Sequence, residues 1–243
     1  MGWFIKLLSS IFGKKTKKEI TKVETPQEVV EEKVIENPVK TEKEKVKITV
    51  DEILKVKKEQ DDKLFEKTLP LVLKYEGGYV NDPDDPGGET NKGIIKTTYD
   101  KYRKNKGLPV VSVKEITDEE IEDIYRNNYW LRGSCNKLFD DLAVIHFDAC
   151  VNTGITQASK FLQRSCGAVD DGKIGPNTLK AVATVSNKAM VEMYFTQRKD
   201  FYENLAQRKP KLKKFLKGWL KRVAHLEQHI KNEENDNNKI SIV

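Results

Sequence analysis

The sequence predicts a mainly α-helical fold that begins near residue 64 and contains one small hairpin or loop region. From residue 64 onward, apolar residues return at spacings of three and four, which is typical of helices with one buried side. Patterns that indicate strands are few, and turn-forming residues gather between residues 79 and 95. With 243 residues, the chain is long enough for one large domain or two small ones.

Composition narrows the class of protein. Charged residues make up 34% of the chain and hydrophobic residues 37%, so we expect some segment to stay outside any core. The net charge of +6 suits an anionic partner, such as a cell-wall polymer, a membrane surface or nucleic acid. Three cysteines, Cys135, Cys150 and Cys166, argue against a disulfide scaffold and fit buried thiols or a reducing compartment.

Residues 1–20 form an amphipathic, basic segment. Large apolar residues at positions 4, 7, 8 and 11 share one helix face, and a cluster of lysines follows them. A secretory signal has the opposite order, and Lys6 stands where a myristoylation signal needs Ser or Thr. We therefore expect synthesis in the cytoplasm without a cleavable signal, and attachment of this segment to an anionic membrane surface. A partner-docking peptide or a disordered start is the alternative.

Residues 21–63 are predicted to be a charged linker. Lys and Glu dominate, and Phe, Trp and Tyr are absent between residues 13 and 64. Such a segment buries too little apolar surface to offset the entropy of ordering, although Val50–Lys58 fits a helical piece.

The helices of the folded part are predicted in order along the chain. The first covers residues 64–75 and ends at Gly77-Gly78, with Pro70 as a local conflict. Thr117 and Glu120 form a capping box that opens another helix through Trp130. The remaining helical segments are expected at 97–104, 140–151, 157–166, 176–185, 188–205 and 209–230. Residues 231–243 are expected to be a disordered tail.

Glu76 has an unusual position for a carboxylate. At the C-terminal end of a helix it faces the negative end of the macrodipole, and Val72, Leu73 and Tyr75 are apolar neighbours. Both effects raise the pKa of a carboxyl group. A protonated carboxylic acid near neutral pH is what cleavage of a glycosidic bond requires. A solvated Glu before a glycine cap is the plainer interpretation.

A second group of carboxylates follows closely. Asp82, Asp84 and Asp85 lie in a loop rich in Pro and Gly, with Thr90 beyond them. Glycosidases use a pair of carboxylates, one as acid and one to activate water or stabilise positive charge. A calcium loop starting at Asp82 would have Pro86 at position 5 and Gly93 at position 12, so an EF-hand is excluded.

The run from Leu73 to Ile94, LKYEGGYVNDPDDPGGETNKGI, resembles the signature of glycoside hydrolase family 108. The resemblance implies a lysozyme-like fold, muramidase activity on the β-1,4 bond between N-acetylmuramic acid and N-acetylglucosamine, and Glu76 as catalytic acid. By similarity to phage-type lysozymes, it assigns Asp85 and Thr90 to positioning or activating water. Four residues separate Asp85 from Thr90 instead of five, so Asp84 or Asp82 remain alternatives. The substrate-binding candidates are Asp84, Asn91 and Asn152. No metal or cofactor is implied.

The second half resembles the peptidoglycan-binding domain that follows the catalytic domain in this family. The matching stretches are FDACVNTG at 147–154, ASKFLQ at 158–163 and DGKIGPNTL at 171–179. We therefore expect a catalytic domain at 64–153 and a helical peptidoglycan-binding domain at 154–230. Peptidoglycan is the expected partner, reached by phage-type lysis, virion delivery or specialised secretion. The alternative function is a non-catalytic peptidoglycan-binding module, which the intact Glu76 disfavours.

Two further patterns suggest other functions. His146 and Cys150 are four residues apart, as a Cys–His peptidase would require, but they lie in an apolar stretch where buried core residues are commoner. Two candidate ligands do not make a four-ligand zinc site. The segment 208–222 holds eight Lys or Arg and no acid; we expect a terminal helix with a solvated basic face. It contains no motif for reading nucleic acid, so no nucleic-acid partner is expected.

Overall fold

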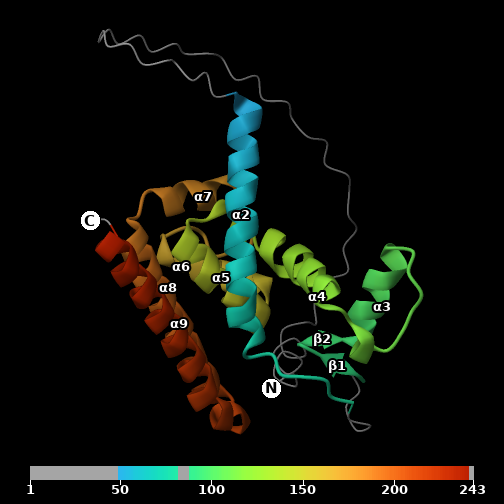
Figure 1. Cartoon of the computed structure of the whole chain (residues 1–243). Helices are drawn as coiled ribbons and strands as arrows, with labels where there is room; N and C mark the ends of the chain where they lie inside the picture. The colour runs from blue at the N-terminus through green and yellow to red at the C-terminus, as the bar shows by residue number, and fades with distance from the viewer. Residues whose placement is uncertain (1–48, 82–87, 241–243) are drawn as a thin grey trace.

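The computed structural model describes residues 49–81 and 88–240 (Figure 1). The predicted N-terminal membrane segment and Asp82, Asp84 and Asp85 lie outside the described residues. The described part is mainly helical, which confirms the predicted fold class. Its α-helices are α2 (Val50–Leu73), α3 (Lys96–Asn105), α4 (Asp118–Tyr125), α5 (Asp140–Thr153), α6 (Ile155–Ser165), α7 (Pro176–Ala183), α8 (Asn187–Arg208) and α9 (Lys213–Ile240).

Helix α2 is longer than the periodicity of its apolar residues indicates. It begins at a capping box in which the Thr49 side chain accepts a hydrogen bond from the Glu52 N–H. Its first residues are exposed and burial begins near Phe65, so one helix crosses from the predicted linker into the predicted folded part. Pro70 lies in its last turn, where loss of one backbone hydrogen bond is tolerated close to the helix end.

A short hairpin follows α2, as the turn-rich sequence predicts. Strand β1 (Thr90–Asn91) pairs antiparallel with β2 (Ile94–Ile95). The two turn residues, Lys92 and Gly93, both have positive φ, the conformation that tight two-residue hairpins require. Val80 forms a bridge to Thr90, with both backbone hydrogen bonds 2.8 Å long.

Helix α4 begins at the predicted capping box of Thr117 and Glu120. It continues as a π-helix over Arg126–Leu131, followed by a turn and the 3₁₀ segment Cys135–Lys137. Two other 3₁₀ segments, Val113–Glu115 and Pro210–Leu212, lie in connections between helices.

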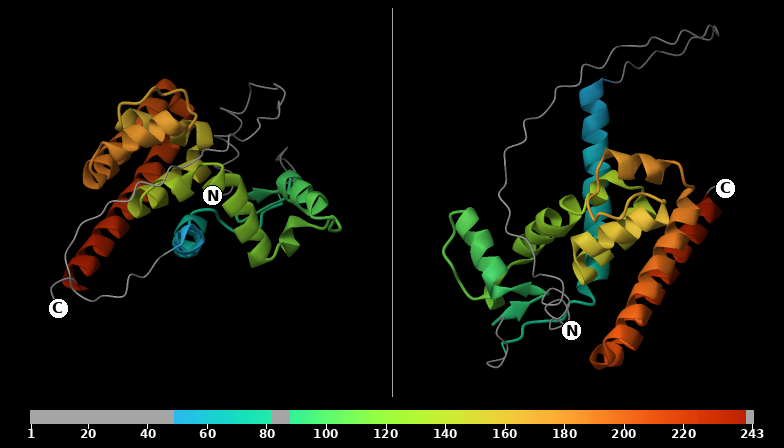
Figure 2. Two further views of the ribbon diagram at one scale, coloured as in Figure 1. Left: turned by 90° about the horizontal axis from the view of Figure 1, so that it is seen from above. Right: turned by 180° about the vertical axis from the view of Figure 1, so that it is seen from behind.

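Helix α5 lies between two hydrophobic cores. All its residues from Leu142 to Thr153 are buried. Ala143, Phe147 and Val151 pack in a core with α2, the hairpin, α3 and α4. Its other faces contribute to a core formed with α6, α8 and α9. Figures 1 and 2 show the corresponding arrangement, with the hairpin, α3 and α4 on one side of α2 and α6–α9 on the other.

The C-terminal helix is also longer than expected. Helix α9 continues to Ile240, through residues for which the composition favours a tail without structure. In the part of the chain that the structure describes, no helix has the length and apolar character needed to cross a bilayer.

Candidate active site

Glu76 lies in the turn that ends α2. Its N–H donates to the Leu73 carbonyl at 3.0 Å, and Gly77 turns the chain away with a φ of 69°. This left-handed conformation suits glycine, which explains why the helix stops here. The Glu76 residue is only 1% exposed, so the carboxylate is packed inside the protein rather than solvated.

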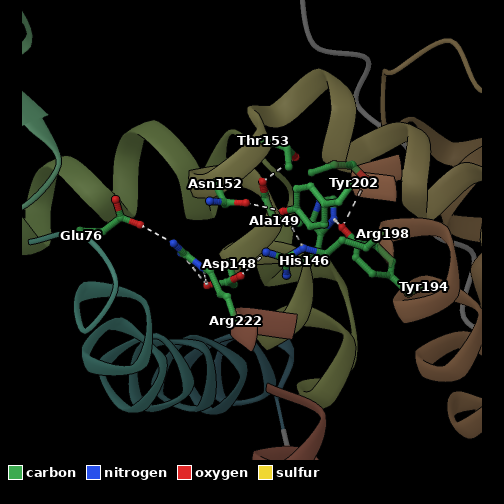
Figure 3. A network of polar contacts seen from close by, with 11 residues as sticks. Glu76, His146, Asp148, Ala149, Asn152, Thr153, Tyr194, Arg198, Tyr202 and Arg222 are labelled. Atoms are coloured by element: carbon green, nitrogen blue, oxygen red, sulfur yellow. Dashed lines mark hydrogen bonds and ion pairs between the residues drawn. The ribbon is translucent and has the colours of Figure 1, made fainter. Parts of the chain in front are cut away.

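The partner of Glu76 is Arg222 of α9. The Arg222 Nη1 donates to Glu76 Oε1 at 2.9 Å, across 146 positions of sequence (Figure 3). Arg222 is 5% exposed, and its guanidinium lies 5.0 Å from the centre of the Tyr75 ring. The expected solvated basic face of this helix is therefore wrong for Arg222, because its charge is needed inside to compensate buried carboxylates.

Asp148 of α5 connects Arg222 to a second buried arginine. Arg222 Nε donates to Asp148 Oδ1 at 2.8 Å, and Arg198 Nη2 of α8 donates to Asp148 Oδ2 at 2.5 Å. Asp148 and Arg198 are both fully buried. With Glu76 ionised, two carboxylates and two guanidiniums balance, which makes burial of four charged side chains tolerable.

The environments of the two carboxylates shift their pKa values in opposite directions. Burial raises the pKa of Glu76 above its ordinary value, and the charge of Arg222 only partly opposes this. Burial would also raise the pKa of Asp148, but Arg222 and Arg198 together outweigh it and the pKa of Asp148 is lowered. Asp148 is paired with both Arg198 and Arg222, whereas Glu76 is paired with Arg222 alone, which it shares with Asp148. Glu76 is thus the carboxyl group that more readily carries a proton.

Asn152 belongs to the same polar network. It is buried on α5, and its side-chain oxygen accepts a hydrogen bond from the Tyr202 hydroxyl. Tyr202 in turn accepts from Arg198 Nε at 3.2 Å. The structure therefore places Asn152 beside the arginine network; its substrate-binding role stays a prediction.

The hairpin brings Thr90 and Asn91 to the side of the molecule that carries α4. Thr90 is 3% exposed, and its hydroxyl has no hydrogen-bond partner among residues 49–81 and 88–240. Asn91 donates to the Val113 carbonyl at 3.2 Å. The Tyr125 hydroxyl of α4 donates to the Lys92 carbonyl at 2.7 Å, which fixes the hairpin turn.

Two tyrosines, the buried Tyr125 and the half-buried Tyr129, are affected by the charge of Glu76. Burial and the negative charge of Glu76 raise the pKa of Tyr129 to about 12. The same two causes raise the pKa of Tyr125. Tyr125 therefore connects the surroundings of Glu76 with the turn of the hairpin that carries Thr90.

Sequence reasoning missed Asp148, Arg198 and Arg222. An Asp within the apolar run of α5 is the signal that was available, because a buried carboxylate needs cationic partners. Nothing in a single sequence identifies which of many arginines supplies them.

Comparison with known proteins places this arrangement in a family. The model of glycosyl hydrolase family 108 matches residues 69–154, and that of a predicted peptidoglycan domain matches residues 157–224. The solved structure of Brucella abortus SagA is 33% identical, with a TM-score of 0.57 over 69% of this chain and 94% of SagA. The chain belongs to glycoside hydrolase family 108. A search of curated proteins gives no match.

Membership of family 108 confirms the resemblance carried by residues 73–94 and by the second half of the chain. This family 108 protein is a glycoside hydrolase that acts on the peptidoglycan of the cell wall. The buried network joins the two matched segments, because Glu76 and Asp148 lie in the first while Arg198 and Arg222 lie in the second.

Proposed function

We propose that the protein is an N-acetylmuramidase that cleaves the β-1,4 bond between N-acetylmuramic acid and N-acetylglucosamine, with Glu76 as general acid. The observation that carries this proposal is the burial of Glu76 at the end of α2, which raises its pKa in a member of a glycoside hydrolase family. The hydrogen bond from Arg222 holds the carboxyl group in one orientation. Glycosidic cleavage needs such an acid to protonate the leaving oxygen.

We assign the second function, positioning or activating water, to Asp85, with Asp84 or Asp82 as alternatives, together with Thr90. Among residues 49–81 and 88–240 the Thr90 hydroxyl has no hydrogen-bond partner, which supports this role, because a buried hydroxyl normally has one. Val80 and Thr90 pair with each other, so the chain enters and leaves segment 82–87 at the hairpin. Asp84, Asn91 and Asn152 are the proposed substrate-binding residues.

The products of peptidoglycan digestion test the function. Purified full-length protein should release new reducing ends, with N-acetylmuramic acid at the reducing terminus of the fragments, and no new peptide amines. New amines would identify a peptidase, and binding to peptidoglycan without any release would identify the non-catalytic wall-binding module. Either result would overturn the proposal.

The rate of this release should depend on pH in one direction. Since the pKa of Glu76 is raised and the protonated form is the acid, the rate should fall as pH rises through that pKa. The measurement is the initial rate of reducing-end release from pH 4 upward in buffers of constant ionic strength. A rate that stays constant into the alkaline range would rule out Glu76 as general acid.

We also propose that residues 1–20 attach the protein to an anionic membrane surface before it acts on the wall, as in phage-type lysis. The support is the apolar face of Trp3–Phe12 followed by four lysines within residues 14–18. Each lysine near anionic lipid contributes about 1 kcal/mol, which is enough with the apolar side chains for reversible binding. Residues 21–63, with the exposed start of α2, would set the reach of the catalytic part.

Deletion of residues 1–20 should abolish co-sedimentation with vesicles that contain anionic lipid and leave muramidase activity unchanged. Vesicles of neutral lipid alone are the control and should sediment little of either form. Equal sedimentation of the full-length and shortened proteins with anionic vesicles would show that residues 1–20 are not the membrane contact. The basic segment 208–222 would then be the remaining candidate if both proteins bind, and there would be no membrane contact if neither binds.

A further inference from the structure

Cys135, His146 and Cys150 converge inside the protein, and none of them is a predicted catalytic residue. One ligand atom from each lies within 4.8 Å of the others, and all three residues are fully buried. The sequence shows only the pair four apart on α5. The third side chain arrives from the 3₁₀ segment that precedes α5, so the objection that two ligands do not make a metal site no longer holds.

The backbone before Cys135 is shaped to bring it there. The chain passes through the π-helix Arg126–Leu131, an element often found at functional positions. A Cβ on Gly133 would lie 2.8 Å from Cys150 Sγ and 2.5 Å from the Tyr129 carbonyl oxygen, so only glycine allows this approach. Ser134 then adopts a left-handed φ of 58°. Such strain persists where the surroundings enforce it, which is typical of binding sites.

The imidazole of His146 is oriented as metal-binding histidines are. Its Nδ1 lies 2.8 Å from the Tyr194 hydroxyl, which lies 3.3 Å from the Ala158 carbonyl. With Nδ1–H donating to Tyr194 and Tyr194 donating to Ala158, each donor has an acceptor, and Nε2 keeps its lone pair. That lone pair faces Cys150 Sγ at 3.5 Å and the Gly133 carbonyl oxygen at 3.0 Å. The Nε2 lone pair and the Gly133 carbonyl oxygen are both acceptors, so their separation of 3.0 Å requires a cation that both atoms bind. The other arrangement is the opposite tautomer, in which Nε2 carries the proton and donates it to this oxygen.

We propose that this cluster binds one zinc ion through Cys135 Sγ, Cys150 Sγ and His146 Nε2, with the Gly133 carbonyl oxygen as fourth ligand. Thiolate and imidazole are the ligands that zinc prefers, and a tetrahedral site with ordinary bond lengths separates sulfur from nitrogen by about 3.5 Å. Binding releases the two thiol protons to solvent, so that two thiolates neutralise the charge of the ion in a fully buried position. With four protein ligands the site is closed to substrate and structural.

The site would fasten parts of the fold that are distant in sequence. Cys135 holds the segment after α4 to α5, and Tyr194 extends the contact to α8. The proposal does not depend on the role of Glu76, because none of these ligands contacts it in the described network.

Zinc content of the full-length protein tests the site. Protein expressed in zinc-supplemented medium and purified under reducing conditions should contain about one zinc per chain by elemental analysis. Replacement by Co²⁺ should give the visible bands of tetrahedral cobalt and a sulfur-to-cobalt charge-transfer band in the near ultraviolet. Cys135→Ser and Cys150→Ser should each lose the zinc. Cys166→Ser is the matched control and should retain it, since Cys166 lies outside the cluster at the end of α6.

Absence of zinc from the wild-type protein together with absence of the charge-transfer band would overturn the proposal even if the serine variants fail to fold. Zinc retained by both Cys135→Ser and Cys150→Ser would also overturn it. A disulfide between Cys135 and Cys150 found by mass spectrometry of the native protein would assign the pair to redox chemistry instead.

Discussion

Glu76→Gln is expected to lower the rate of reducing-end release from peptidoglycan by about 10²- to 10⁴-fold, the usual contribution of a general acid. Glutamine has nearly the same shape as glutamate and its amide oxygen can still accept the hydrogen bond from Arg222 Nη1. It has no acidic proton to give to the leaving oxygen. The effect should therefore appear in kcat, measured at the optimal pH of the wild-type protein, with little change in binding to peptidoglycan.

Glu59→Gln is the matched control for this experiment. Glu59 lies on the same helix, α2, but in its exposed first half. This variant should retain wild-type activity, and thermal unfolding of both variants should show that the fold is intact. Undiminished release by a folded Glu76→Gln protein would remove Glu76 from the mechanism.

Asp148→Asn is expected to lower the free energy of unfolding by about 3–5 kcal/mol, the usual cost of breaking a buried ion pair. Asp148 is fully buried and compensates Arg198 and Arg222 at the same time. Asparagine keeps the size of the side chain but leaves two buried cations without this anion. The measurement is the midpoint of urea unfolding, followed by circular dichroism at neutral pH.

Asp170→Asn provides the comparison. Asp170 pairs with Arg164 at 2.6 Å, but both side chains are more than 40% exposed, so the loss should stay within about 1 kcal/mol. The pKa of Asp148 is lowered in the folded state, so its stabilising contribution is present above the ordinary pKa of aspartate and is lost as pH falls through the lowered value. The gap between wild type and Asp148→Asn should narrow on strong acidification. Equal effects of the two substitutions would show that burial of the network contributes no stability.

The sequence was informative where the cause of structure is local. The helix period from residue 64, the capping box at Thr117 and the turn-forming residues between 79 and 95 each depend on neighbours in the chain. The structure has a helix through residue 73, a helix that begins at Thr117 and a hairpin within 79–95. The position of Glu76 beside the end of α2 follows from the same local pattern.

Features that depend on distant residues were not predictable in this way. In the sequence, Arg222 is indistinguishable from the other basic residues of segment 208–222. Its contacts with Glu76 and Asp148 in the folded protein are what distinguish it. Cys135 becomes a candidate ligand only because the fold brings the turn after α4 next to His146 and Cys150 of α5. The full lengths of α2 and α9 were missed because their charged ends resemble a linker and a tail.

Helix α5 is buried by both halves of the chain, and the guanidinium beside Glu76 comes from the half that matches a peptidoglycan domain. Neither of the two matched segments can therefore be exchanged for an unrelated domain without loss of buried contacts. A chimera that kept residues 69–154 and replaced the rest with an unrelated wall-binding module would expose one side of α5 and leave Glu76 and Asp148 without their arginines. An exchange of the second matched segment would therefore remove the partners of Glu76 and Asp148 together with the segment that resembles a peptidoglycan domain.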